Sequence, residues 1–249
     1  MQAVILAGGL GTRLGPLTSS VPKPMVTVHG RPFLEYQLTL LARNGITDVV
    51  LCVGYLGEQV VQHVGDGRAF GINVRYSWDG EQLLGPVGVM KNAEPVLDDS
   101  FFVLYGDAYL RLDYRALMEA MLLSRRLGAM AVLHNYHEYG PSDLLVADGI
   151  VKEYDKQFRR DLEWVNFGVS ALRREALTLA EPHRFCDEET FYGRLIAQGQ
   201  LAAFEVKNRF YEIGNPLGLA QFTHFIVHGA GQPDATPTLL ETKKKGDRS

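Results

Sequence analysis

The chain is poor in the features that define several protein classes. It has only 2 cysteines among 249 residues, which provides neither a disulfide framework nor the paired spacing of a zinc site. A net charge of −4 argues against general affinity for nucleic acid. No apolar run is as long as a membrane span, and none is typical of a signal peptide. These absences predict a cytoplasmic protein that does not act on a membrane or on nucleic acid.

The composition is that of an ordinary globular chain, with 46% hydrophobic and 22% charged residues. One α/β domain over residues 1–228 fits better than two domains, because large α/β folds often exceed the usual domain size. Residues 229–249 are polar and without periodicity, so we expect a disordered tail there. Cys52 lies in an apolar run and is expected to be a buried, inert thiol.

In the first half, apolar runs alternate with segments of helical spacing. The runs predict strands at 2–7, 49–54, 72–77 and 101–105. The spaced apolar residues predict helices at 33–44, 57–64 and 113–127. Such alternation favours right-handed crossovers and a mainly parallel sheet with helices on both faces.

The second half is less regular, which predicts a mixed extension of the sheet. Strands are expected at 129–134, 143–147, 150–154 and 164–172. Helices are expected at 173–180, 187–198 and 215–228.

A glycine-rich loop follows the first predicted strand directly. Its three glycines let the backbone turn tightly and bring N–H groups close to a polyanion; they are Gly8, Gly9 and Gly11. Arg13 adds a permanent cation, and Lys23 brings a second one from a segment between two prolines. The glycines could serve only a tight turn, but the two cations favour a site for a triphosphate.

Two familiar phosphate loops do not match this segment. The dinucleotide fingerprint G-x-G-x-x-G would need a glycine where the chain has Leu14. The P-loop would need Gly-Lys-Ser or Gly-Lys-Thr, and residues 11–13 are Gly-Thr-Arg.

Residues 8–18 and 22–24 do resemble another signature, G-G-x-G-T-R-L-x-P-L-T followed by P-K-P. It belongs to the sugar-1-phosphate nucleotidylyltransferases, or NDP-sugar pyrophosphorylases, and the resemblance extends over roughly residues 1–226. The chain is most similar to the short bacterial members that act on hexose or heptose 1-phosphates. The resemblance implies a Rossmann-like (GT-A-like) sheet and Mg²⁺-dependent transfer of a nucleotidyl group from an NTP to a sugar 1-phosphate. The products would be an NDP-sugar, for surface polysaccharide synthesis, and pyrophosphate.

The resemblance also implies a nucleotide site. Arg13, Lys23 and Asp107 would be catalytic. The nucleotide would be bound by Leu6, Ala7, Gly8, Gly9, Gly11, Thr12, Arg13, Lys23, Gly85 and Gly88. The family holds base and ribose in a loop L-G-T-G/A-G, which corresponds to residues 84–88. Pro86 and Val87 depart from that pattern and proline lacks an amide donor, so the base stays open.

Two carboxylates are candidates for a metal site. Tyr105-Gly106-Asp107 ends an apolar strand and matches the family's G-D motif, although an aspartate there could also be a plain turn former. Residues 210–216 resemble the late D-I-G-T-P motif, with Glu212 in place of aspartate and Asn215 in place of threonine. Asp107 and Glu212 would then hold Mg²⁺, which needs only one or two protein carboxylates.

The acceptor site is implied by two further segments. Glu153 and Lys156 resemble the family's acid-x-x-lysine segment, in which the lysine binds the sugar phosphate. Asn166 and Gly168 resemble its asparagine-x-glycine sugar contact, and the amide can both donate and accept.

Two other functions remain open at this stage. The acceptor could be a phosphorylated non-sugar alcohol, as in related cytidylyltransferases. The altered loop at 86–87 and Glu212 would also suit an inactive, NTP-binding regulatory subunit. No Ser, Cys or His is framed as an activated nucleophile, so no covalent intermediate is expected. The resemblance allows a homodimer, and no predicted helix face decides this.

Overall fold

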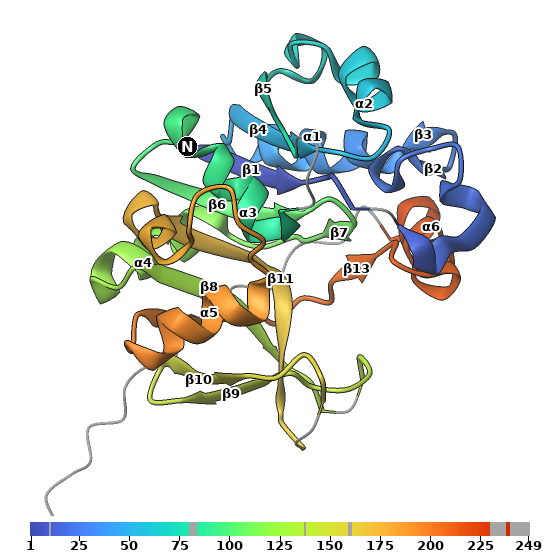
Figure 1. Ribbon diagram of the computed structural model, residues 1–249. Coiled ribbons are helices and arrows are strands. Elements are labelled where there is room, and N and C mark those ends of the chain that lie inside the picture. The colour runs from blue at the N-terminus through green and yellow to red at the C-terminus, as the bar shows by residue number, and fades with distance from the viewer. Residues whose placement is uncertain (10, 80–83, 137, 159–160, 230–237, 240–249) are drawn as a thin grey trace, which may run out of the picture.

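The computed structural model describes residues 1–9, 11–79, 84–136, 138–158, 161–229 and 238–239. Strand β1 (Gln2–Leu6) lies in the main sheet between β4 (Asp48–Val53) and β6 (Ser100–Tyr105) (Figure 1). Strand β5 (Asn73–Trp78) pairs with the far side of β4. All four strands run parallel, as the alternating pattern predicts.

Two apolar layers enclose this sheet because successive side chains of a strand point to opposite faces. In β1, Ala3 and Ile5 pack into one layer and Val4 into the other, and all three are fully buried. A strand buried on both faces needs the continuous apolar sequence that residues 3–6 have.

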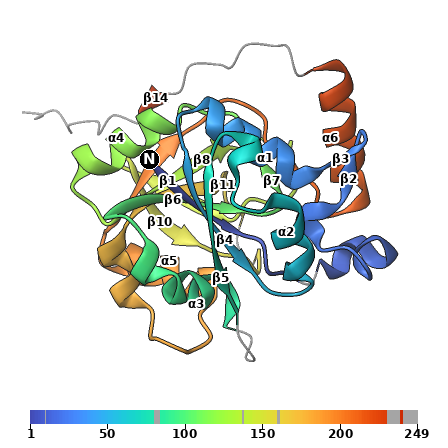
Figure 2. The same ribbon diagram turned by 90° about the horizontal axis from the view of Figure 1, so that it is seen from above.

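Helices cover both faces, as expected (Figure 2). One layer contains α1 (Phe33–Arg43), α2 (Gly57–Val64) and α4 (Tyr114–Ser124). The other contains α3 (Gly85–Asn92) and α5 (Glu188–Ala197).

The second half extends the sheet with mixed pairing, which confirms the expected fold class. Strand β11 (Trp164–Arg173) is antiparallel to β6 and to β8 (Gly128–His134), and β12 (Leu201–Glu205) runs parallel to β8. A hairpin of β9 (Leu144–Ala147) and β10 (Ile150–Tyr154) joins the same sheet.

The order of strands creates a switch point beside β1. The chain passes from β1 through β4 to β5 on one side and then returns to β6 on the other side. The loops after β1 and β6 therefore diverge, which leaves a crevice at the carboxyl ends of the strands.

Short elements complete the fold. Strand β2 (Thr27–Val28) pairs with β3 (Arg31–Pro32), and β7 (Ala108–Tyr109) pairs with β13 (Tyr211–Glu212), each as a separate two-stranded sheet. Strand β14 (Thr238–Leu239) pairs with β12 of the main sheet. The 3-10 helices are η1 (Thr12–Thr18), η2 (Lys23–Met25), η3 (Arg68–Phe70), η4 (Glu94–Val96) and η5 (Arg174–Leu179).

Helix α6 (Pro216–His228) brings the end of the domain back to the beginning of the chain. It lies beside β2 and β3 (Figure 1). Its Phe222 is fully buried, with its ring centroid 5.0 Å from that of Phe33 and 5.6 Å from that of Tyr36. A separate small core thus joins α6 to the segment that follows the glycine loop.

Some segments differ from expectation. Residues 85–92 form α3 where a loop was expected, because Pro86 occupies the first turn, where its missing N–H is not needed. Burial of Val87, Val89 and Met90 then offsets the poor helix propensity. The predicted helix at 173–180 is the 3-10 helix η5, and strand β12 was not predicted.

The proposed division at residue 228 stays a prediction. Of the predicted tail, 230–237 and 240–249 lie outside the described residues, while Thr238 and Leu239 pair with β12. Among the helices that the structure describes, none combines the length and apolarity of a membrane span. Cys52 is a free, fully buried thiol, as expected.

We predict that Phe222→Ala lowers the free energy of unfolding by about 3–5 kcal/mol, because it leaves a cavity in the core under α6. Urea unfolding would measure this. The control is Leu217→Ala on the same helix, where the side chain is 68% exposed and the expected change is within about 0.5 kcal/mol. Equal stability of the two variants would contradict the packing described.

Candidate active site

The glycine loop begins where β1 ends. A Cβ added to Gly8 would lie only 2.7 Å from Oδ2 of Asp79, whereas one added to Gly9 would meet nothing within 4 Å. Gly11 has a φ of 65°, a left-handed conformation that favours glycine. Gly8 is therefore required by packing and Gly11 by backbone shape, while the backbone at Gly9 is open to a ligand. Leu10, within the same signature, lies outside the described residues.

The two predicted cations come from the 3-10 helices that follow the loop. Arg13 is exposed on η1, which Thr18 ties to the loop by donating its hydroxyl to the Gly11 carbonyl at 3.0 Å. Lys23 begins η2, and its ammonium forms an ion pair with the carboxylate of Asp107. Only 13% of the Lys23 side chain is exposed, so its charge is held at the carboxyl ends of the strands.

A short strand pairing brings the two predicted metal ligands together. Strand β7 pairs with β13, with Ala108 opposite Glu212, and the Ile213 N–H donates to the Asp107 carbonyl at 2.9 Å. Asp107 follows β6 of the main sheet, whereas Glu212 ends β13, shortly before α6 begins.

Three charged groups converge on one point at Gly214. A Cβ placed on this glycine would lie 3.1 Å from Oε2 of Glu212, 3.3 Å from Nη2 of Arg13 and 3.4 Å from Oδ2 of Asp107. Residues from three distant segments of the chain thus direct opposite charges at a common position. The structure thus brings Arg13, Asp107 and Glu212 close together, and the roles assigned to them from the sequence stay predictions.

Asn215, a departure from the family motif, has a clear structural role. Its Oδ1 accepts the Gly218 N–H at 2.9 Å and so caps the N-terminus of α6. Its Nδ2 donates to Oε1 of Glu212 at 2.8 Å. One side chain therefore begins the helix and fixes the orientation of the glutamate.

The donor set fits a hard divalent cation. Two carboxylates approach one position, and Mg²⁺ takes one or two protein carboxylates while keeping several waters. Within the described residues, no cluster of three or more His, Cys, Asp or Glu could hold a metal. The geometry therefore suits a cation shared with substrate phosphates rather than one enclosed by protein ligands.

A pocket of about 350 Å³ lies beside Lys23 and Asp107 at the switch point. It is lined by Leu6, Ala7, Gly8, Gly9, Lys23, Pro24, Asp79, Gly85, Pro86, Val89, Tyr105, Gly106, Asp107 and Phe185. The start of the glycine loop, Lys23 and Asp107 thus share one concave site with the start of α3, whereas Arg13 and Glu212 lie outside its lining.

The two glycines at the start of α3 also serve packing. A Cβ on Gly85 would lie 2.8 Å from the Cys186 carbonyl oxygen, and one on Gly88 would lie 2.7 Å from that of Arg184. Backbone hydrogen bonds join Leu84 and Val87 to Cys186. Gly85 lines the pocket, whereas Gly88 faces the segment 184–186; Leu83 lies outside the described residues.

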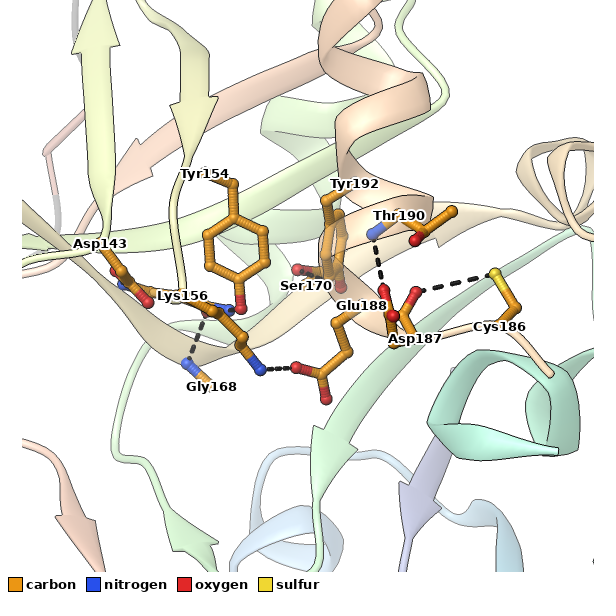
Figure 3. A network of polar contacts seen from close by, with 11 residues as sticks. Asp143, Tyr154, Lys156, Gly168, Ser170, Cys186, Asp187, Glu188, Thr190 and Tyr192 are labelled. Carbon is orange, nitrogen blue, oxygen red and sulfur yellow. Dashed lines mark hydrogen bonds and ion pairs between the residues drawn. The ribbon is translucent and has the colours of Figure 1, made fainter. Parts of the chain in front are cut away.

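The predicted acceptor lysine lies beside this pocket. The Lys156 ammonium pairs with the carboxylate of Glu188 in the first turn of α5 (Figure 3). It is 5.6 Å from the ring centroid of Tyr154 and 5.8 Å from that of Tyr105, which lines the pocket. Partial burial lowers the pKa of Lys156, against the opposing effect of nearby carboxylates that include Asp107.

Asn166 occupies a hydrogen-bonded position on β11. Its Nδ2 donates to the Tyr154 hydroxyl at 3.2 Å, and its Oδ1 accepts the Gly168 N–H at 2.9 Å. Its own N–H donates to Oδ1 of Asp143 at 2.8 Å. Gly168 has a φ of 94° where the pairing of β11 with β8 is interrupted. The described contacts therefore place Asn166 and Gly168 close to Tyr154, two residues before Lys156.

Glu153 lies on β10, just after the register of this strand with β9 shifts, and is partly buried. It lies near the end of β10, three residues before Lys156, which is the spacing of the family's acid-x-x-lysine segment.

Three site residues were not predicted from the sequence. Asp79 directly follows β5 and Asp107 comes two residues after β6, so both lie at strand ends, but only the order of the strands shows that Asp79 meets the pocket. Glu188 and Tyr105 carried no comparable signal, because an acidic residue in a first helical turn and a strand tyrosine are both common.

Comparison with known proteins identifies the family. The model of the nucleotidyl transferase family matches residues 2–140. The chain belongs to this family. That range includes the glycine loop, both cations and Asp107.

Several members of the nucleotidyl transferase family are similar to the chain. The D-glycero-alpha-D-manno-heptose 1-phosphate guanylyltransferase of Campylobacter jejuni is 29% identical over 92% of this chain and 100% of the relative. The mannose-1-phosphate guanyltransferase of Saccharomyces cerevisiae is 31% identical over 87% of this chain. The UTP–glucose-1-phosphate uridylyltransferase of Synechocystis is 35% identical over 61% of it. The chain spans 62% of the yeast relative and 40% of the Synechocystis one.

Solved structures agree with this assignment. HddC from Yersinia pseudotuberculosis, complexed with GMP-PN, has a TM-score of 0.76 and 26% identity, covering 90% of this chain and 99% of that one. A glucose-1-phosphate thymidylyltransferase structure from Bacillus anthracis shares the fold, with a TM-score of 0.80 at 18% identity over 94% of this chain and 98% of that one.

We predict that the network around Asn166 makes stability depend on pH. Burial raises the pKa of Asp143 to about 6 from 3.8, so the folded protein holds this proton more tightly than the unfolded chain. The stabilisation is present below pH 3.8 and is lost as the pH rises through about 6.

Asp143→Asn keeps an acceptor for the Asn166 N–H but removes this titration. Relative to the unmodified protein, its free energy of unfolding should increase between about pH 4 and 7 and then level off. Urea unfolding at a series of pH values would measure it, with Asp148→Asn as control, since 80% of the Asp148 side chain is exposed. A parallel pH dependence of the two variants would contradict the prediction.

Proposed function

We propose that the protein transfers a nucleotidyl group from an NTP to a sugar 1-phosphate, producing an NDP-sugar and pyrophosphate. The convergence of Arg13, Asp107 and Glu212 on one point supports this, next to Lys23 and a glycine loop. Membership of the nucleotidyl transferase family and the activities named for its relatives support the same reaction.

In this reaction an oxygen of the sugar phosphate attacks the α-phosphorus of the NTP. A phosphorus–oxygen bond forms, the bond to the leaving pyrophosphate breaks, and the electron pair stays with the pyrophosphate. The protein must align two anions and neutralise the charge that develops on the leaving group. Lys23 and Arg13 would supply fixed positive charge, and the backbone amides of Gly9, Gly11 and Thr12 would bind the phosphates.

Asp107 and Glu212 would hold the divalent cation. Mg²⁺, when bound, would neutralise phosphate charge that Lys23 and Arg13 do not reach. Asn215 keeps the Glu212 carboxylate directed toward this position.

The acceptor would bind on the side of the pocket formed by β10 and β11. Lys156 would contact the sugar phosphate, while Asn166, Gly168 and Glu153 would contact the sugar. The proximity of Lys156 to Tyr105 supports this, because Tyr105 also lines the nucleotide pocket. A role in surface polysaccharide synthesis, a cytoplasmic location and a homodimer stay predictions.

The decisive experiment is pyrophosphate release with Mg²⁺ over a grid of five nucleotides and a panel of sugar 1-phosphates. One strongly active combination would identify both substrates. The phosphorylated amino alcohols belong in the panel as alternative acceptors. Binding of NTP without release of pyrophosphate from any acceptor would instead indicate a regulatory subunit.

We predict that Lys23→Ala lowers turnover about 10²–10³-fold, the usual cost of losing one preorganised charge at a developing anion. Lys152→Ala, at a partly exposed lysine on β10, is the control and should keep normal turnover. Both should unfold at the same temperature as the unmodified protein. Near-normal turnover of Lys23→Ala would reject the proposed reaction.

We also predict that Glu212→Gln raises the Mg²⁺ concentration needed for half-maximal turnover, because the site loses one anionic ligand while size and shape are preserved. Asp107→Asn should have the same effect on the metal requirement and a larger one on maximal turnover. Titration of Mg²⁺ at saturating substrates measures both effects. An unchanged metal requirement in both variants would argue against the two-carboxylate site.

A further inference from the structure

Asp79 presents a carboxylate to the nucleotide pocket, and none of the described residues pairs with it. It follows β5, and its backbone N–H donates to the Val53 carbonyl at 3.1 Å. Its Oδ2 lies over two other strand ends, since it would be 2.7 Å from a Cβ on Gly8 and 2.3 Å from one on Gly54. In the described part of the chain, no side chain forms a hydrogen bond or ion pair with this carboxylate.

Such a group calls for donors from a ligand. Burial raises the pKa of Asp79, so its charged form carries a desolvation cost that no donor among the described residues offsets. Gly8 and Gly54 have no side chains, and this leaves the carboxylate its space beside the pocket. A ligand that supplied N–H donors here would satisfy both oxygens.

Asp79 enters the pocket from the side opposite Lys23, and its carboxylate reaches back only as far as Gly8 at the start of the glycine loop. Lys23 and Asp107 mark the phosphate end, after β6, and Asp79 follows β5. Three strand spacings separate β6 from β5, which is roughly 14 Å. A nucleotide with its phosphates at Lys23 therefore directs its base toward Asp79.

Only one common base offers two adjacent N–H donors on one edge. Guanine presents N1–H beside its N2 amino group, which matches the two oxygens of a carboxylate. Uracil and thymine present one N–H between two carbonyl oxygens, and a carboxylate would repel those oxygens. Adenine and cytosine present an amino group next to an unprotonated ring nitrogen, which is also an acceptor.

We propose that Asp79 selects guanine by accepting the N1–H and N2–H bonds of GTP, which makes the protein a guanylyltransferase. This inference rests on the proposed function. Phe185 lines the same pocket with 64% of its surface exposed, and an aromatic side chain at such a position can stack on a base.

The test is calorimetric titration of nucleoside triphosphates with Mg²⁺ and no acceptor. GTP should bind at least about 10-fold more tightly than UTP, CTP or ATP, because a bidentate hydrogen-bonded contact usually discriminates between bases by at least that factor. Inosine triphosphate, which lacks the N2 amino group, should lie between GTP and the others.

Asp79→Asn supplies a sharper readout, because an asparagine amide donates on one side and accepts on the other. This variant should lose about 10–100-fold in GTP affinity. It should also gain affinity for xanthosine triphosphate, whose C2 carbonyl replaces the guanine amino group. Such a reversal cannot come from general damage to the fold.

The control is Asp48→Asn, because Asp48 begins β4 at the opposite edge of the sheet from the pocket. It should leave every nucleotide affinity unchanged. Equal affinity of the unmodified protein for GTP and UTP would overturn the inference, and so would Asp79→Asn without a gain for xanthosine triphosphate.

The test separates this inference from the proposed function. Selective GTP binding through Asp79 without pyrophosphate release would reject the reaction and keep the base assignment. Efficient turnover of UTP would keep the reaction and reject the base assignment.

Discussion

The geometry of the site depends on one two-residue strand pairing. When β7 joins β13, the chain after Asp107 is held against the chain around Glu212, and the Ile213 N–H closes the contact on the Asp107 carbonyl. The pairing is short, so it cannot be stable by itself. Helix α6 supports it, because Phe222 and Phe225 pack against residues that follow the glycine loop. The carboxylates, the arginine and the loop are therefore parts of one packed unit, and loss of the small core under α6 would separate them.

The two lysines of the candidate site form ion pairs with carboxylates in the absence of substrate. Lys23 pairs with Asp107, and Lys156 pairs with Glu188. A buried unpaired charge is costly, so each carboxylate lets the fold keep a cation in a partly buried position. In the proposed reaction, substrate phosphates would replace these carboxylates at the lysines, and Asp107 would then be available to a metal ion.

The sequence predicted the fold well where periodicity was strong. The candidate site residues that stand in ordered motifs lie near one another in the structure, and their roles stay predictions. The strands around β1 and most helices lie within a few residues of their expected positions. Helix α3 was missed, because Gly85, Pro86 and Gly88 disfavour a helix locally and only the burial of Val87, Val89 and Met90 stabilises it. Asp79 and Glu188 were missed for another reason. Their importance comes from strand order and from the docking of α5, which no local pattern encodes.

The order β6-β1-β4-β5 also has an evolutionary consequence. In the proposed reaction, bond formation would take place over β1 and β6, the base would reach β5, and the acceptor would bind near β10 and β11. The nucleotide and the acceptor would therefore be selected by residues at the ends of different strands of one rigid sheet. One substitution after β5 can therefore change the preferred nucleotide without disturbing the catalytic centre. That separation explains why relatives with named uridylyl and guanylyl activities can descend from one scaffold.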